Sequence, residues 1–220
     1  MPRQIVFALI VFALVLAGCQ RGETEPPRPV SWTTSPRAEA PGRVAVLPVA
    51  LAAGIGRSAQ AATEAIAGAL RELGKHEVVL VDRDTALEIA PADPLKDNRI
   101  DAEMLLRLRQ RLRADAVLLV RVEQFQSYDP IILGMTAHLV ACGDGSVLWS
   151  CTAHFDGARA EIQRDIEAWN ERNAGSASAS VSGWRLVLSS PALFLRYASD
   201  RMVTTIPVAP DRSVKMPFIH

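Results

Sequence analysis

The sequence predicts an α/β protein with a three-layer mixed β-sheet in β-α-β-α-β-β-β order, flanking helices and further helices at the C-terminus. Two observations predict this class. Between residues 43 and 126, short Val-rich apolar runs alternate with segments of helical periodicity, which is typical of parallel β-α-β units. After residue 130, two apolar segments are joined by Asp144-Gly145, and Asp-Gly between alternating residues is a strong hairpin signal.

The first two strands and the helix between them have clear local signals. RVAVLPVA, from Arg43, and HEVVLVDR, from His76, are nearly continuous apolar runs, as expected for strands covered on both faces. The intervening helix has apolar residues at helical spacing and should end at Gly74, since glycine readily adopts the left-handed conformation that follows a helix.

The next elements complete the sheet. A weaker helix is predicted around Leu87 and Ile89, and a clearer one in DAEMLLRLRQRLR, with Asp101 as its cap. ADAVLLVRVEQFQ should form a long third strand. IILGMTAHLVAC and VLWSCTAHF then form the hairpin, with Asp144-Gly145 in a type I′ turn that needs positive φ at both residues.

Beyond the hairpin the sequence predicts helices. A polar helix should run from Ala158 to about Asn173, and the small-residue segment AGSASASVSG should be a flexible link. A final helix is expected with Ser190 as its cap, Pro191 in its first turn and Pro207 after its end. Its apolar face could pack on the domain, bind a partner or lie on a membrane.

The N-terminal segment has the layout of a secretory signal peptide. Arg3 precedes an unbroken apolar run, Ile5 to Leu16, and small residues lead to Cys19. The run is shorter than the roughly 20 residues of a permanent membrane-spanning helix, although an N-terminal membrane anchor is the alternative. LAGC, ending at Cys19, resembles a bacterial lipobox. That resemblance implies acylation of Cys19, cleavage before it, and a stable lipid anchor.

The mature chain should therefore begin at Cys19, and four segments are predicted. Residues 1–18 are the signal peptide, residues 19–42 a lipidated Pro-rich tether, residues 43–156 the α/β domain, and residues 157–220 a helical C-terminal extension. The tether would be extended and able to reach several tens of ångströms, although Trp32 could dock on the domain. Gln20, rather than Asp, follows the lipidated position, which favours the periplasmic face of the outer membrane over the inner membrane.

Composition argues against several function classes. Lys+Arg and Asp+Glu both number 24, so the chain lacks the basic excess that usually accompanies nucleic-acid binding. Aromatic residues make up 5% of the chain, which also weakens the case for base stacking. Hydrophobic residues make up 49%, enough for a core, and bulk disorder is not expected.

The residues that could carry chemistry do not form a recognisable catalytic or ligand-binding motif. The histidines, His76, His138, His154 and His220, show no zinc-ligand spacing, so we expect no metal. GIGRS lacks the residues of a phosphate-binding loop, and G-x-S-x-G does not occur, so no cofactor and no catalytic residue are predicted. Asp82 and Asp84 follow a parallel strand, where α/β sites often form, but a turn and helix cap explains them as well.

Cys142 and Cys151 are candidates for a disulfide in an exported protein. With Asp144-Gly145 as the turn, Cys142 faces Val147 and Cys151 faces His138. The two cysteines then lie about 13 Å apart along the strand, well beyond the Cα reach of a disulfide at about 7 Å. We therefore predict two unpaired thiols.

Several strings, taken in order, resemble a group of bacterial periplasmic lipoproteins that includes LpoB, CsgG and the N-terminal domain of TolB. They are RVAVLPVA, VDR at Val81-Asp82-Arg83, RADAVLL from Arg113, and GDGSVLW from Gly143. The resemblance covers roughly residues 43 to 155. It implies a small α/β domain that binds other proteins and has no catalytic residues.

Together these observations predict a non-enzymatic lipoprotein of the cell envelope. Its partners would be the membrane, through the anchor, and another envelope protein whose identity the sequence leaves open, as in envelope assembly, peptidoglycan synthase activation or transport. Two alternatives remain. One is a subunit of an oligomeric outer-membrane secretion pore, and the other is an envelope hydrolase. The oligomeric state is also left open.

Overall fold

The computed structural model describes residues 29–36, 40–52, 59–90, 93–95, 100–173 and 183–207. The predicted signal peptide, Cys19, most of the predicted tether and the Ser/Ala link lie outside these residues. His220 and the rest of the C-terminal tail also lie outside them.

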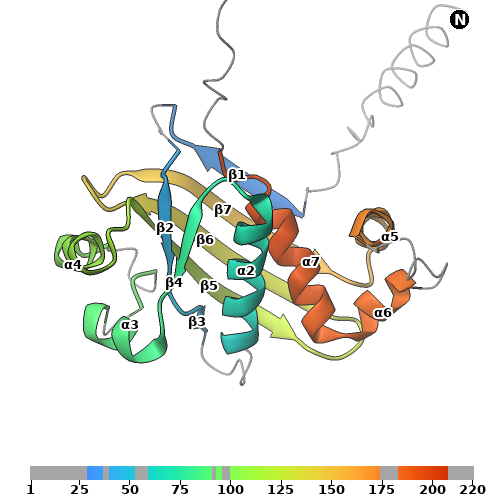
Figure 1. Cartoon of the computed structure of the whole chain (residues 1–220). Coiled ribbons are helices and arrows are strands. Elements are labelled where there is room, and N and C mark those ends of the chain that lie inside the picture. The colour runs from blue at the N-terminus through green and yellow to red at the C-terminus, as the bar shows by residue number, and fades with distance from the viewer. Residues whose placement is uncertain are drawn as a thin grey trace, which may run out of the picture.

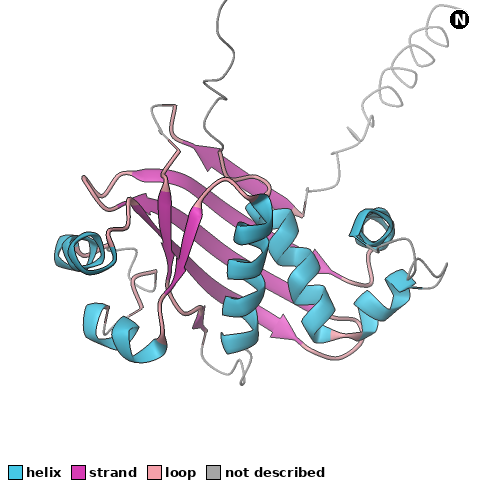
Figure 2. Ribbon diagram, in the orientation of Figure 1, coloured by secondary structure: helices cyan, strands magenta, loops and turns pink. Residues whose placement is uncertain are grey.

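One mixed sheet of seven strands forms the centre of the protein (Figures 1 and 2). Its strands lie in the order β1-β7-β6-β5-β2-β4, and β3 also pairs with β5. β5 pairs in parallel with β2 and β3, β2 pairs in parallel with β4, and the remaining neighbours are antiparallel. The strands are β1 (Val30–Thr34), β2 (Arg43–Val46), β3 (Ala50–Leu51), β4 (Glu77–Leu80), β5 (Ala116–Gln126), β6 (Ile132–Ala141) and β7 (Val147–Asp156).

Helices cover both faces of the sheet, which confirms the predicted α/β class. α2 and α7 lie side by side on one face, with α5 and α6 beyond them, while α3 and α4 pack on the other face (Figure 1). The helices are α2 (Ala59–Leu73), α3 (Arg83–Ile89), α4 (Ala102–Leu112), α5 (Ala160–Asn173), α6 (Gly183–Ser189) and α7 (Pro191–Val203).

Two hydrophobic clusters, one on each face, explain the continuous apolar run of β2. Val44 and Val46 belong to the larger cluster with the buried residues of α2 and α7. Ala45 and Leu47 point the other way, into a smaller cluster with α3 and α4. A strand covered on both faces needs apolar residues at successive positions, and this is the pattern that predicts the strand from sequence.

The predicted helix ends agree with the structure. Gly74 follows α2 with φ of +67°, and Asp101 caps α4 by accepting a hydrogen bond from the backbone N–H of Glu103. Ser190 caps α7 and Pro191 occupies its first turn. Of the three interpretations of this last helix, packing on the domain is confirmed, because its apolar face is buried against α2 and the sheet. α6 was not predicted from the sequence.

Five residues assigned to the tether belong to the sheet. Residues 30–34 form β1, which pairs antiparallel with β7 from Val30 opposite Ala153 to Thr34 opposite Trp149. Trp32 is therefore held in a strand at the edge of the domain, with 46% of its surface exposed. The described chain joins the sheet at Val30, well before the predicted domain start at Arg43.

The predicted type I′ turn is wrong. β6 ends at Ala141 and β7 begins at Val147, so the connection is longer than two residues. Gly145 has φ of +74° and donates its N–H to the carbonyl of Ala141 at 3.0 Å, but Asp144 does not share the positive φ. Instead, the Asp144 carboxylate accepts a hydrogen bond from the N–H of Ser146 at 2.9 Å, a local bond that shapes the longer loop.

The longer loop and a bulge also change the strand register. Val140 pairs with Val147, and Cys151 pairs with Ala137 rather than with His138. Both predicted partner assignments are therefore wrong by one or two positions. Nevertheless Cys142 and Cys151 are free and buried, in agreement with the prediction of unpaired thiols.

Candidate functional site

The candidate site lies where the parallel strands β2 and β4 end, an edge at which α/β proteins commonly bind ligands. Two pockets meet there, of about 230 Å³ and about 670 Å³, and they share Pro48 and Arg83. We call the two together the carboxyl-edge groove. Pro48 follows β2, and Arg83 is the first residue of α3.

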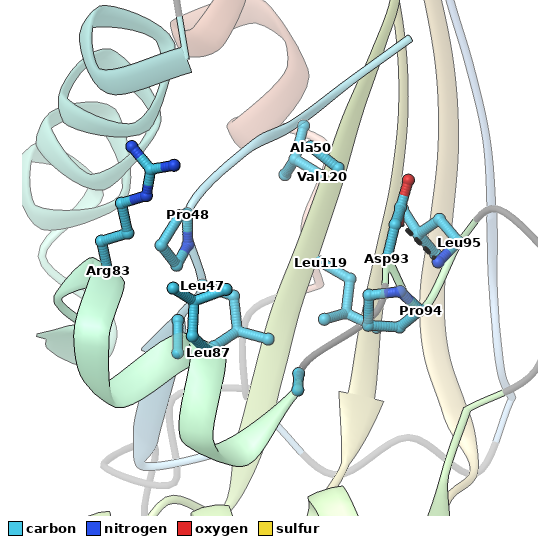
Figure 3. A pocket seen from close by; sticks show the side chains of 12 residues that line it. Leu47, Pro48, Ala50, Arg83, Leu87, Asp93, Pro94, Leu95, Leu119 and Val120 are labelled. Carbon is cyan, nitrogen blue, oxygen red and sulfur yellow. Dashed lines mark hydrogen bonds between the residues drawn. The ribbon is translucent and has the colours of Figure 1, made fainter. Parts of the chain in front are cut away.

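The smaller pocket is mainly apolar (Figure 3). Pro48, Leu47 and Leu87 lie on one side of it, and Leu119 and Pro94 lie across from them. Leu87 is 54% exposed, so it presents apolar surface to solvent at the wall of this pocket. The other apolar residues that line this pocket are Ala50, Ala86, Ala90, Leu95 and Val120.

The carboxylate of this pocket, Asp93, is already paired. Asp93 forms an ion pair with the guanidinium of Arg121 and accepts a hydrogen bond from the N–H of Leu95 at 2.9 Å. A hydrogen bond to Glu123 and the charge of Asp93 raise the pKa of Arg121, so this guanidinium stays charged. The Asp93 carboxylate is therefore committed to holding its own loop against β5.

The larger pocket lies between the end of β4 and the start of α2. Thr63 is its buried polar residue, and its hydroxyl both accepts from the N–H of Val49 at 2.9 Å and donates to the carbonyl of Ala59 at 2.7 Å. Leu80, at the end of β4, is 40% exposed at the rim. This pocket, like its neighbour, thus offers a partner apolar surface.

Asp82 and Asp84 lie at this edge as the sequence predicts, but they do not form a carboxylate pair for catalysis. Asp82 caps α3, accepting hydrogen bonds from the N–H of Thr85 at 2.9 Å and from its hydroxyl at 2.6 Å. These bonds lower the pKa of Asp82 and keep it ionised. Asp84 lies in the first turn of α3, where a negative charge is favourable. The turn-and-cap interpretation is confirmed.

The structure does not bring together the three histidines that it describes. His138 pairs with Ser150 and His154 pairs with Gly134, so the two occupy different positions along the hairpin. Burial lowers the pKa of His138. His76 forms a hydrogen bond through Nδ1 with the carbonyl of Pro41 at 2.7 Å. Within the residues that the structure describes, no three His, Cys, Asp or Glu side chains are grouped to hold a metal ion.

Two residues of the strings that carry the family resemblance, Asp115 and Trp149, have structural roles. Asp115 fixes the start of β5 to the start of β2, because its carboxylate accepts from the N–H of Arg43 at 2.8 Å and its own N–H donates to the Arg43 carbonyl at 2.9 Å. Trp149 is fully buried, and its indole N–H donates to the hydroxyl of Thr205 at 3.1 Å. These two residues therefore stabilise the fold, whereas Leu47, Pro48 and Arg83, which belong to the same group of strings, line the groove.

The two thiols are separated by the sheet itself. Cys142 belongs to the cluster with α3 and α4, whereas Cys151 belongs to the cluster with α2 and α7. Burial raises the pKa of Cys142 to about 11 and that of Cys151 to about 12, so both remain protonated at neutral pH. Thiols on opposite faces cannot form a disulfide without unfolding, and a protonated thiol is a poor nucleophile.

Among the described residues, no helix is long and apolar enough to cross a membrane. The predicted lipidation site, Cys19, lies outside these residues. The lipid anchor at Cys19 therefore stays a prediction.

The chain is similar to several solved structures of other proteins. Neither a family model nor a curated protein matches the chain. The PelC dodecamer from Paraburkholderia phytofirmans is 19% identical over 79% of this chain and 98% of that one, with a TM-score of 0.44. Lipoprotein GNA1162 from Neisseria meningitidis is 21% identical over 63% of this chain and all of that one, with a TM-score of 0.42.

The LpoB C-terminal domain from Salmonella enterica is also among the similar structures. It is 18% identical over 54% of this chain and 86% of that one, with a TM-score of 0.40. LpoB, which the sequence motifs resemble, is thus found again by comparison of structures.

Proposed function

We propose that the protein is a non-enzymatic lipoprotein of the bacterial cell envelope that binds another envelope protein through the carboxyl-edge groove. Cys19 carries the lipid anchor, and the domain lies at the periplasmic face of the outer membrane. The single observation that carries the binding role is the groove itself, in which Leu80 and Leu87 are exposed while the buried polar groups are already hydrogen-bonded or paired.

The state of these polar groups favours binding over catalysis. A catalytic residue must reach the reacting atoms with a free donor or acceptor at a suitable pKa. At this edge Asp82 caps a helix, Asp93 is paired with Arg121, and Thr63 uses both its donor and an acceptor site internally. Besides the guanidinium of Arg83, the groove offers a partner apolar contact, which stabilises a complex by removing side chains from water.

The position of β4 indicates what kind of partner segment would fit. β4 is the last strand of the described sheet and pairs with β2 alone, so its outer edge can pair with an added strand. An extended segment along β4 would bring alternate side chains to the rim at Leu80. We therefore propose an extended partner segment with apolar side chains.

In-cell photocrosslinking tests this proposal. A photoreactive amino acid replaces Leu87 in the full-length chain, and the same residue replaces Leu106 on α4 as a control of matched exposure, 51% against 54%. We expect the probe at residue 87, but not the one at residue 106, to capture one envelope protein. In a second experiment the photoreactive amino acid replaces Leu80 instead, so that residue 87 can be substituted. Leu87→Glu should then reduce the crosslinked product at least about tenfold, because a charge would be buried against apolar side chains.

A further arm tests the anchor. Cys19→Ser should also reduce the crosslinked product, because the tethered domain is held at a higher effective concentration near its partner. Loss of the product in Leu106→Glu as well as in Leu87→Glu would count against the groove. Equal capture from residues 87 and 106, together with turnover of an envelope polymer by the purified chain, would contradict the proposed role.

A further inference from the structure

The place where the chain enters the sheet limits how far the domain can move from a lipid anchor. The carbonyl of Pro29 accepts a hydrogen bond from the N–H of His154 at 2.7 Å, and β1 follows at once. Pro29 comes ten residues after Cys19. Even fully extended, these residues span only about 35 Å. The end of the sheet that carries Pro29 is therefore the end held nearest to the acylated residue.

The strand register shows what else lies at that end. Ile132, at the start of β6, pairs with Asp156 at the end of β7 and with Gln126 at the end of β5. The β5–β6 loop and the turn from β7 into α5 are therefore at the same end as Pro29. α6 lies beside them, because Asp129 of the loop and Trp184 of α6 line one shallow pocket. Figure 1 shows α6 at the opposite end of the molecule from α4.

The side chains at this end have the chemistry of a membrane interface. Tyr128 is 71% exposed and Leu186 is 60% exposed, the two highest values among the exposed large hydrophobic residues of the described chain. Arg185 is exposed, and its guanidinium lies over the ring of Trp184, 5.1 Å from the centroid. Tyr and Trp rings favour the headgroup region of a bilayer, and an arginine can contact phosphates while its stem remains in apolar surroundings.

We propose that Tyr128, Trp184, Arg185 and Leu186 form a membrane-contacting surface, which rests on the leaflet to which Cys19 is anchored. This inference depends on the lipid anchor of the proposed function. A bilayer is the expected occupant because the connection from Cys19 to Pro29 is short. This connection holds this end of the sheet within reach of the leaflet, whereas the carboxyl-edge groove is formed by other residues.

Site-specific fluorescence on the lipidated full-length chain tests the surface. Leu186→Cys and, as a matched control on α4, Leu106→Cys are labelled with the environment-sensitive dye NBD. Cys142 and Cys151 are buried and should stay unlabelled in the folded chain. The protein is reconstituted into vesicles of phosphatidylethanolamine and phosphatidylglycerol. We expect emission at residue 186 to rise, shift to the blue and be quenched by lipids brominated on their acyl chains, and emission at residue 106 to remain that of dye in water.

The outcomes separate this inference from the anchor on which it depends. Vesicle flotation and the intact mass report on the acylated Cys19, independently of either dye. A chain that floats with the vesicles while both probes remain water-like would overturn the membrane-contacting surface and leave the anchor standing. A chain without acyl groups that fails to float would overturn both. Tyr128→Cys provides a second probe of the surface if Leu186→Cys disturbs folding.

Discussion

Deleting residues 174–220 is expected to abolish cooperative folding. The deletion removes α6 and α7, and α7 buries one complete face against α2 and the sheet. Each large apolar side chain buried from water contributes about 1.5–3 kcal/mol, whereas a whole domain is stable by only about 5–15 kcal/mol. The buried residues of α7 are Phe194, Leu195, Tyr197, Ala198, Ser199, Met202 and Val203. Circular dichroism and urea unfolding would measure the effect.

A matched truncation controls for the loss of chain length. A chain that ends at Pro207 lacks residues 208–220 but keeps every described helix, and we expect it to unfold cooperatively with a midpoint close to that of the full mature chain. If the chain ending at Asn173 unfolded with the same midpoint, α7 would be an appendage, and the assignment of its apolar face to the core would be wrong.

Trp149→Ala is expected to lower the free energy of unfolding by about 3–5 kcal/mol, the usual cost of removing a buried large aromatic side chain. Trp149 is fully buried in the cluster beneath α7. Its removal would leave a cavity and would also leave the hydroxyl of Thr205 without its indole donor. Urea unfolding, followed by far-ultraviolet circular dichroism, provides the measurement.

Two further substitutions separate packing from hydrogen bonding. Thr205→Val keeps the volume but removes the acceptor of the Trp149 indole N–H, and should cost about 1–3 kcal/mol. Trp32→Ala removes a side chain that is 46% exposed, and we expect it to cost less than Trp149→Ala by at least about 2 kcal/mol. Equal losses for Trp32→Ala and Trp149→Ala would contradict the burial described for β7.

Much of the fold could be predicted because its signals are local. β2 is apolar at successive positions since it has a hydrophobic cluster on each face, and α2 has its apolar residues at helical spacing since one side packs on the sheet. Asp101 and Ser190 cap their helices through bonds to residues two or three positions away. Such features depend on a few neighbouring residues, which the sequence displays directly.

The elements that were not predicted depend on distant partners. β1 is a run of five residues in a proline-rich segment, and its pairing with β7 is what makes it a strand. α6 is only seven residues long, and Val187 is its buried residue. The hairpin was expected from Asp144-Gly145, but the bond from Ser146 to Asp144 and the bulge beside Val140 produce a longer loop.

The sequence did not predict the candidate groove. Asp82 and Asp84 lie at the edge of the sheet where the groove is found, but Leu47, Leu87 and Leu95 come from three separate segments and look like ordinary core residues in the sequence. The exposure of Leu87 follows from the way α3 sits on the sheet, which no local pattern encodes. By contrast, lipidation of Cys19 is predicted from the short string LAGC, and this prediction does not depend on the fold.

β7 receives both ends of the described chain, because β1 pairs with it and Thr205 bonds to its Trp149. The β1–β7 pairing joins residues more than 100 positions apart and the bond from Trp149 to Thr205 joins residues 56 positions apart, and contacts between distant residues slow folding. One apolar face of β7 should therefore remain uncovered until the last helix arrives, a period in which an unfolded chain is prone to aggregate. We infer that this protein needs a holding chaperone more than a helical bundle of the same length would.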